Sequence, residues 1–87
     1  MPSDSPTAAV RRVAKRIADL RRERGLTQDQ MAEGLKTATK NYQRIEYGQN
    51  VTITMLVRIA NLLGVTITEL VPPPAVRKRE ARPASAE

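Results

Sequence analysis

The sequence contains no cysteine and no histidine, and its only aromatic residues are two tyrosines. Without thiols and imidazoles the chain has no disulfide, no usual zinc ligand set and no histidine to act as a base. Its few serines lie near the two chain ends, away from any basic side chain that could activate a nucleophile. We therefore expect no catalytic residue, no metal ligand and no cofactor, and we expect that the chain is not an enzyme.

Long apolar runs are absent as well. A membrane-spanning helix requires a run of about 18 apolar residues, which the sequence lacks, and the segment from Met1 to Pro6 is polar. These features predict neither a membrane span nor a secretory signal peptide. We expect a cytoplasmic protein with no membrane partner.

Positive charge is what the sequence has in excess. Fifteen lysine and arginine residues stand against nine acidic residues, which gives the 87-residue chain a net charge of +6. Such an excess favours a polyanionic partner. Because two tyrosines provide too few rings for stacking single-stranded bases, double-stranded DNA is the better candidate.

Capping signals and helical periodicity predict the first two helices. Ser5 and Pro6 begin the first, whose apolar residues recur at spacings of three and four until Gly25. The many basic residues between them are expected to be mostly solvated. Thr27 and Gln30 have the spacing of a capping box and begin the second helix, which is short.

Three more helices follow. The third is predicted from about Thr39 to Tyr47, and the fourth between a cap at Thr52 and a stop at Gly64. Thr66 and Glu69 repeat the capping-box spacing for a short last helix. Since no segment between residues 6 and 71 alternates with a period of two, we predict an all-α fold, a compact five-helix bundle.

One face of the third predicted helix is polar and carries long side chains. At about 100° per residue, these side chains fall within an arc of roughly 140°: Thr39, Lys40, Gln43, Arg44 and Tyr47. Two short helices joined by a tight turn, the second with such a face, are typical of a helix-turn-helix.

Composition divides the chain into three parts. We predict a disordered N-terminus over residues 1–5, a domain over 6–71 and a disordered, proline-rich basic tail over 72–87. The tail either contacts DNA or only solubilises the protein. A domain this small is of marginal stability. A five-helix bundle cannot wholly cover its apolar end segment, which predicts a homodimer: Val65, Ile67, Leu70 and Val71.

Several linked motifs in order carry a family resemblance over roughly residues 10–71. They are LRRERGLTQ at 20–28, Met31-Ala32, QRIEYG at 43–48, NVTI at 50–53 and IANLLGV at 59–65. In this order they resemble the phage-repressor (Cro/C1, XRE-type) helix-turn-helix family.

The resemblance implies site residues. Four side chains of the third helix match base-contacting positions of the family: Thr39, Lys40, Gln43 and Arg44. Four others match positions that contact DNA phosphates: Gln28, Tyr47, Gln49 and Asn50. Arg21 and Glu46 match an ion pair that holds the third helix at its angle. Arg and Lys can donate to guanine, and Gln can pair with adenine, so the residue types suit these roles.

Two positions depart from the family pattern. Lys36 stands in the turn where glycine is usual, so the backbone there is either left-handed with some strain or of a different shape. Tyr42 replaces a branched aliphatic residue, and its hydroxyl must reach a polar partner or the surface.

The resemblance implies a sequence-specific, double-stranded DNA-binding transcriptional regulator of bacterial or phage type. It would read the major groove with the third helix, as a dimer on an inverted-repeat operator. An alternative is an antitoxin or protein-binding module of the same fold, which neutralises a partner protein and regulates its own operon.

Overall fold

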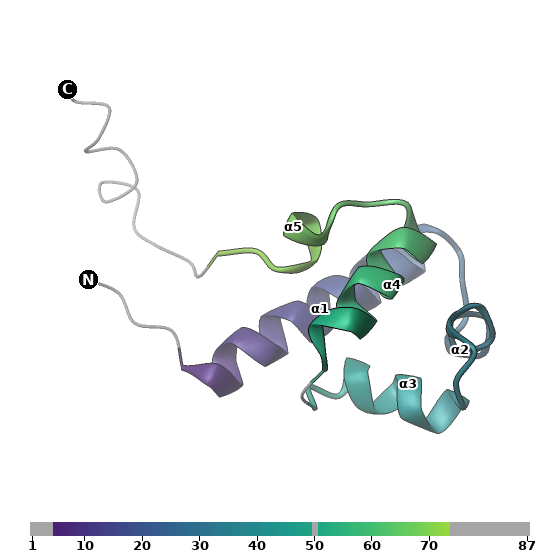
Figure 1. Cartoon of the computed structure of the whole chain (residues 1–87), viewed down its shortest axis with the longest axis horizontal. Coiled ribbons are helices and arrows are strands. Elements are labelled where there is room, and N and C mark those ends of the chain that lie inside the picture. Colours follow the sequence, from purple (N-terminus) through teal and green to yellow (C-terminus); the bar gives the residue numbers. More distant parts are fainter. Residues whose placement is uncertain (1–4, 50, 74–87) are drawn as a thin grey trace.

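The computed structural model describes residues 5–49 and 51–73. The described chain forms five α-helices and no strand (Figure 1), so the predicted all-α fold is confirmed. They are α1 (Pro6–Glu23), α2 (Gln28–Leu35), α3 (Thr39–Glu46), α4 (Ile53–Leu63) and α5 (Ile67–Leu70). The predictions for residues 1–4, for Asn50 and for most of the tail lie outside the described residues.

Local capping explains where most of these helices begin. Ser5 accepts a hydrogen bond from the Ala8 N–H at 3.1 Å, and Thr52 caps α4 in the same way. Thr27 and Gln30 form both bonds of the predicted capping box. These bonds satisfy N–H groups that have no partner within the first turn of a helix.

The capping box predicted for α5 is wrong. The Thr66 side chain makes no cap hydrogen bond to the backbone. The Glu69 N–H donates instead to the Thr66 carbonyl at 3.0 Å, because α5 is a single tight turn, and this leaves it unavailable to the threonine hydroxyl. That hydroxyl lies 2.9 Å from the hydroxyl of Thr68.

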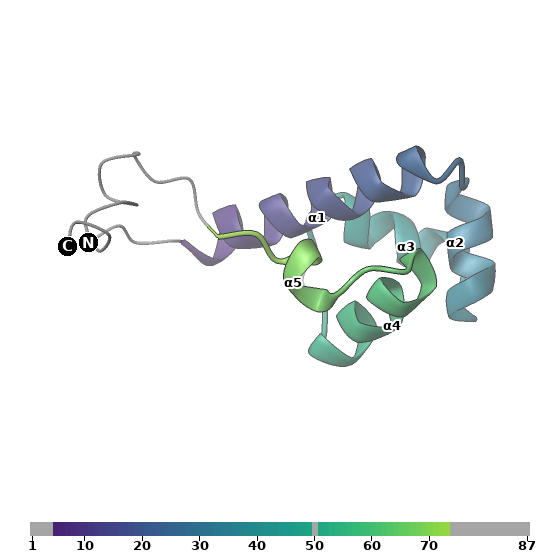
Figure 2. The same cartoon turned by 90° about the horizontal axis from the view of Figure 1, so that it is seen from above.

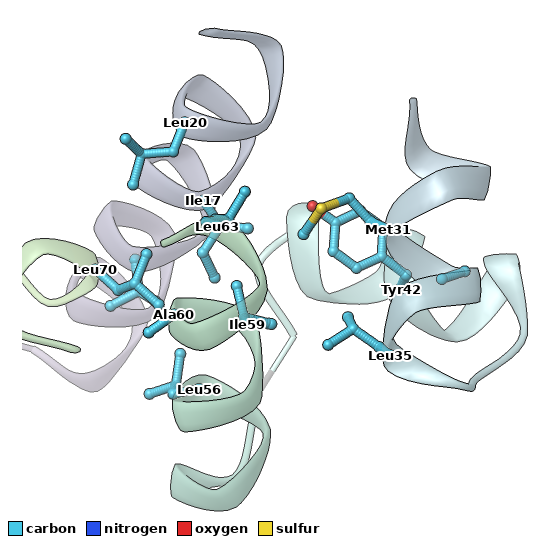
Figure 3. Close-up of a cluster of buried hydrophobic side chains, with 12 residues drawn as sticks. Ile17, Leu20, Met31, Leu35, Tyr42, Leu56, Ile59, Ala60, Leu63 and Leu70 are labelled. Atoms are coloured by element: carbon cyan, nitrogen blue, oxygen red, sulfur yellow. The ribbon is translucent and has the colours of Figure 1, made fainter. Parts of the chain in front are cut away.

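The core joins all five helices. Figure 3 shows Ile17 and Leu63 on one side of the cluster and Met31 and Tyr42 on the other, with Ile59 between them. The Tyr42 ring is fully buried, which removes a large apolar surface from water and fixes α3 against the bundle.

The apolar end segment is partly covered, as predicted, and most of it packs against the core. Leu70 is completely buried, and Val65 and Ile67 are half-buried against the core, so only Val71 is exposed. The cause is the position of α5, which folds back beside α1 (Figure 2). The Arg16 guanidinium holds it there through a 3.0 Å bond to the Glu69 carbonyl.

Basic side chains cap the ends of neighbouring helices, so the prediction that those of α1 are mostly solvated is wrong for several of them. Arg16 caps α5, as above, and Arg24 donates to the Leu63 carbonyl at the end of α4 at 2.6 Å. From α4, Arg58 donates to the Leu35 carbonyl at the end of α2. Cations are favourable there because the last carbonyls of a helix lack partners and carry partial negative charge.

The turn between α2 and α3 contains a left-handed lysine. Lys36 has φ 58° and ψ 46°, and the Thr37 N–H donates to the Ala32 carbonyl at 3.0 Å. This is the hydrogen-bonding pattern of a Schellman helix end, in which the left-handed residue is usually glycine. Of the two alternatives for Lys36, the structure shows the left-handed one.

Replacing Lys36 with glycine is therefore expected to stabilise the domain. A left-handed backbone costs a residue with a Cβ about 1–2 kcal/mol. Glycine removes this strain, but part of the stabilisation is lost because glycine is more flexible in the unfolded chain. We expect Lys36→Gly to exceed Lys36→Ala by about 1 kcal/mol in the free energy of unfolding, measured with urea.

The reverse change supplies the control. Gly64 ends α4 at φ 75° and has open space where a Cβ would lie, so Gly64→Ala tests backbone strain alone. Gly64→Ala should lower the free energy of unfolding by about 1 kcal/mol. Equal stability of Lys36→Gly and Lys36→Ala would contradict the proposed strain.

Candidate nucleic-acid interface

The interface candidate is the outer face of α3 together with the segments on either side of it. α2 and α3 pack closely across the turn at Lys36, and α3 also packs against α1 (Figures 1 and 2). Lys40, Asn41 and Arg44 are exposed on α3, whereas Thr39 and Gln43 are half-buried beside α2. The only acidic residue of α3, Glu46, points inward.

The Glu46 carboxylate is the centre of a buried polar cluster. Arg21 of α1 donates to it from Nε at 2.6 Å and from Nη2 at 3.3 Å. The Tyr42 hydroxyl and the Gln28 amide also donate, the latter at 3.0 Å. The Glu46 side chain is only 5% exposed and that of Arg21 only 11%. The pair implied by the resemblance thus lies within ion-pair distance, and α1, α2 and α3 meet at one carboxylate.

The cluster shifts the pKa of each member. The hydrogen bond to Glu46 raises the pKa of the Arg21 guanidinium. Burial, and then the bond to Glu46, raise the pKa of the Tyr42 phenol well above its ordinary range. Burial alone would raise the pKa of Glu46, but donation from Arg21, Tyr42 and Gln28 outweighs it and lowers that pKa. At neutral pH the cluster therefore contains one anion, one cation and one neutral phenol.

The cluster also sets the orientation of an amide on the outer face of α3. A carboxylate accepts hydrogen bonds only, so the Gln28 nitrogen faces Glu46 and its oxygen faces away. That oxygen accepts from Gln43 Nε2 at 3.0 Å. The oxygen of Gln43 and its second N–H are left for another partner.

The other predicted base-contacting side chains are placed differently. The Thr39 hydroxyl donates to Asp29 of α2 at 2.8 Å, a contact between helices that no sequence motif indicated. Arg44 approaches the Asn41 oxygen at 3.5 Å, a weak bond. Lys40 is exposed and makes no hydrogen bond or ion pair with any residue of the described chain. Lys40 and Arg44 are thus the freest donors on this face.

The predicted phosphate-contacting residues lie at the start of α2 and after the end of α3. Gln28 is the first residue of α2 and is half-buried. Tyr47 and Gln49 follow α3, and Tyr47 is 76% exposed. Asn50 lies outside the described residues. The structure therefore brings Gln28 next to Gln43 and places Tyr47 at the far end of α3.

The described parts of the chain contain no group of three or more acidic, histidine or cysteine side chains that could hold a metal ion. None of their helices is both long and apolar enough to cross a membrane.

Comparison with known proteins identifies the motif. A family model described as helix-turn-helix matches residues 17–70. A hypothetical transcription factor NHTF from Neisseria has a similar structure, with a TM-score of 0.73 over 97% of this chain and 95% of that one, at 18% identity. A search of curated proteins found no match.

The chain also resembles part of a larger protein. Structures of FeII HppE, and of CoII HppE in complex with substrate, match with a TM-score of 0.71 at 30% and 29% identity. They match 75% and 77% of this chain but only 35% and 38% of theirs. The chain thus spans little more than a third of the length of those proteins.

The lowered pKa of Glu46 predicts a loss of stability in acid. Because the folded-state pKa lies below the ordinary value of 4.5, the stabilisation is fully present above about pH 4.5 and is lost as the pH falls through the folded-state pKa. Glu46→Gln keeps the shape but cannot ionise. At neutral pH it should be less stable by about 2 kcal/mol, the contribution of a hydrogen bond to a charged group.

The measurement is urea unfolding of both proteins from neutral to acid pH. Other carboxylates titrate in both proteins, so their effects cancel in the difference. The difference should shrink steadily below about pH 4.5. A difference that stays constant into acid would mean that the charge of Glu46 does not stabilise the fold.

Proposed function

The chain belongs to the helix-turn-helix family of Cro/C1 (XRE) type, a DNA-binding family, and we propose that it is a sequence-specific regulator of transcription that reads double-stranded DNA with α3. The supporting observation is the outer face of α3. Its only acid is buried at 5% exposure, while Lys40 and Arg44 remain exposed. The similar structure of NHTF, a hypothetical transcription factor, is in keeping with this proposal.

Each residue of α3 has a distinct proposed role in the major groove. Lys40 and Arg44 donate to guanine O6 and N7, as their free donors allow. Gln43 pairs with adenine through its remaining oxygen and N–H, because Gln28 occupies only one of its donors. Thr39, whose hydroxyl is bound to Asp29, offers its methyl group to thymine.

Phosphate contacts position the helix without reading sequence. We assign them to the first residue of α2 and to residues that follow α3: Gln28, Tyr47, Gln49 and Asn50. Gln28 keeps one N–H after bonding Glu46 and Gln43, so it can link a phosphate to the amide that reads a base. We propose no enzymatic activity for this chain, which has neither cysteine nor histidine.

We also propose that the regulator is a homodimer. Because Leu70 is buried and Val65 and Ile67 are half-buried, Val71 is the one exposed residue of the predicted end segment, and α4 offers a larger apolar face. Three apolar side chains of α4 are exposed: Ile53 at 68%, Val57 at 42% and Leu62 at 38%. Of these, Ile53 and Val57 lie four residues apart on one face. A second copy would cover this face and place two α3 helices on inverted half-sites. In the antitoxin alternative, the same face would bind a different protein.

Base reading is tested by binding to an operator selected from a random duplex pool. We expect Gln43→Ala and Arg44→Ala each to lose about 1–3 kcal/mol of operator affinity, while binding to scrambled duplex changes by less than about twofold. Thr68→Ala, on α5, is the matched control and should change neither. Equal losses on both duplexes would reject base reading by α3 and favour the protein-binding alternative.

The dimer is tested by sedimentation equilibrium at micromolar protein. Ile53→Glu places a charge in the proposed interface and should yield monomers, because a buried unpaired charge is costly. Gln30→Glu adds the same charge on α2, retains the capping-box chemistry and should remain dimeric. A monomeric native protein that binds single half-sites would refute the dimer.

A further inference from the structure

A polar groove lies between α1 and the end of α3, outside the face that reads bases. Its volume is about 310 Å³, and Ala14 and Ala18 of α1 form part of its lining together with Tyr47 and Gly48. The small alanine side chains leave this space open between the two helices. The Arg11 side chain runs along it, with Cγ 3.6 Å from where a Cβ of residue 48 would lie.

The charges around the groove favour an anion. Arg11, Lys15 and Arg22 line it from α1. Arg11 has no hydrogen bond or ion pair within the described chain. Lys15 pairs with Asp19 at 3.0 Å, yet its side chain remains 78% exposed, so its ammonium can still reach an incoming group.

The acidic groups of the groove are already partnered. Asp19 accepts from Lys15 at 3.0 Å and lies 3.4 Å from Arg22. Glu46 accepts from Arg21, Tyr42 and Gln28 deeper in the protein. The groove therefore has an unpartnered cation but no unpartnered anion.

The position of the groove relates it to DNA. α3 has eight residues and is about 12 Å long, close to the width of the major groove. The end of a helix lying in that groove therefore meets the sugar-phosphate backbone at its edge. A helix C-terminus carries partial negative charge and repels phosphate unless cations lie beside it. Here α1 supplies those cations.

We propose that this groove binds one phosphate of the DNA backbone next to the bases that α3 reads, with Arg11 and Lys15 as its donors and the Tyr47 hydroxyl at its rim. The inference rests on the proposed function and extends it to α1. Arg22 supports the site by holding Asp19, which competes with the phosphate for Lys15. The first helix would then take part in docking the protein on DNA as well as in the core.

The test uses Arg11→Gln, Lys15→Gln and the double variant of the full chain. Both side chains are exposed, so folding should be unaffected, which thermal unfolding checks. Each lost phosphate contact lowers the slope of log affinity against log salt by about 0.9. We expect a fall of about that size for the double variant, equal for operator and scrambled duplex. Thr68→Glu, on α5, lowers the net charge by one, as each single variant on α1 does. It should leave the slope as in the native protein.

Ethylation of individual phosphates locates the contact. Ethylation of one phosphate beside the bases read by α3 should weaken DNA binding by the native protein but not by the double variant. The groove proposal is overturned if the double variant keeps the native slope and ethylation pattern, or changes no more than Thr68→Glu does. If Gln43→Ala and Arg44→Ala meanwhile still lose operator affinity alone, only the groove has failed. If they lose affinity for both duplexes equally, the proposed function has failed.

Discussion

The buried carboxylate of Glu46 is the group on which the arrangement of the interface depends. It accepts hydrogen bonds from Arg21 on α1, from Tyr42 on α3 and from Gln28 on α2. A buried ion pair contributes little net stability compared with apolar packing, but loss of one partner is costly, so its main effect is to favour one geometry. Through Gln28 the same carboxylate sets the orientation of the Gln43 amide, and so couples the angle of α3 to the groups that α3 presents.

The excess of positive charge is divided between structure and surface. Arg16 of α1, Arg24 directly after α1 and Arg58 of α4 each donate to a carbonyl near the end of another helix, where their charge offsets the helix dipole. Among the described residues, the basic side chains without a hydrogen bond or ion pair are fewer and lie elsewhere: Lys36 in the turn before α3, Lys40 on α3 and Arg11 on α1. Net charge thus indicates the class of partner, but its three-dimensional distribution decides which surface binds it.

Predictions from sequence succeeded where the interaction is local. The capping box of Thr27 and Gln30 needs only residues three apart, and it is present. The same spacing failed at Thr66 and Glu69, since the short turn directs the Glu69 N–H to a backbone carbonyl instead. The apolar end segment was expected to be only partly covered, and Val71 is exposed, but the periodicity could not show that Leu70 is the residue buried against α1 and α4.

The sequence by itself determined the five helices, most of their ends, the family and the polar face of the third helix, because caps, glycine stops and periodicity act over a few neighbouring residues. Only the tertiary structure decided which polar side chains on that face are engaged and which are free. Thr39 is bound to Asp29 and Gln43 to Gln28, whereas Lys40 remains free. The reason is physical: each of these partners is on another helix, and a hydrogen bond between helices forms only after packing has brought its donor and acceptor within about 3 Å.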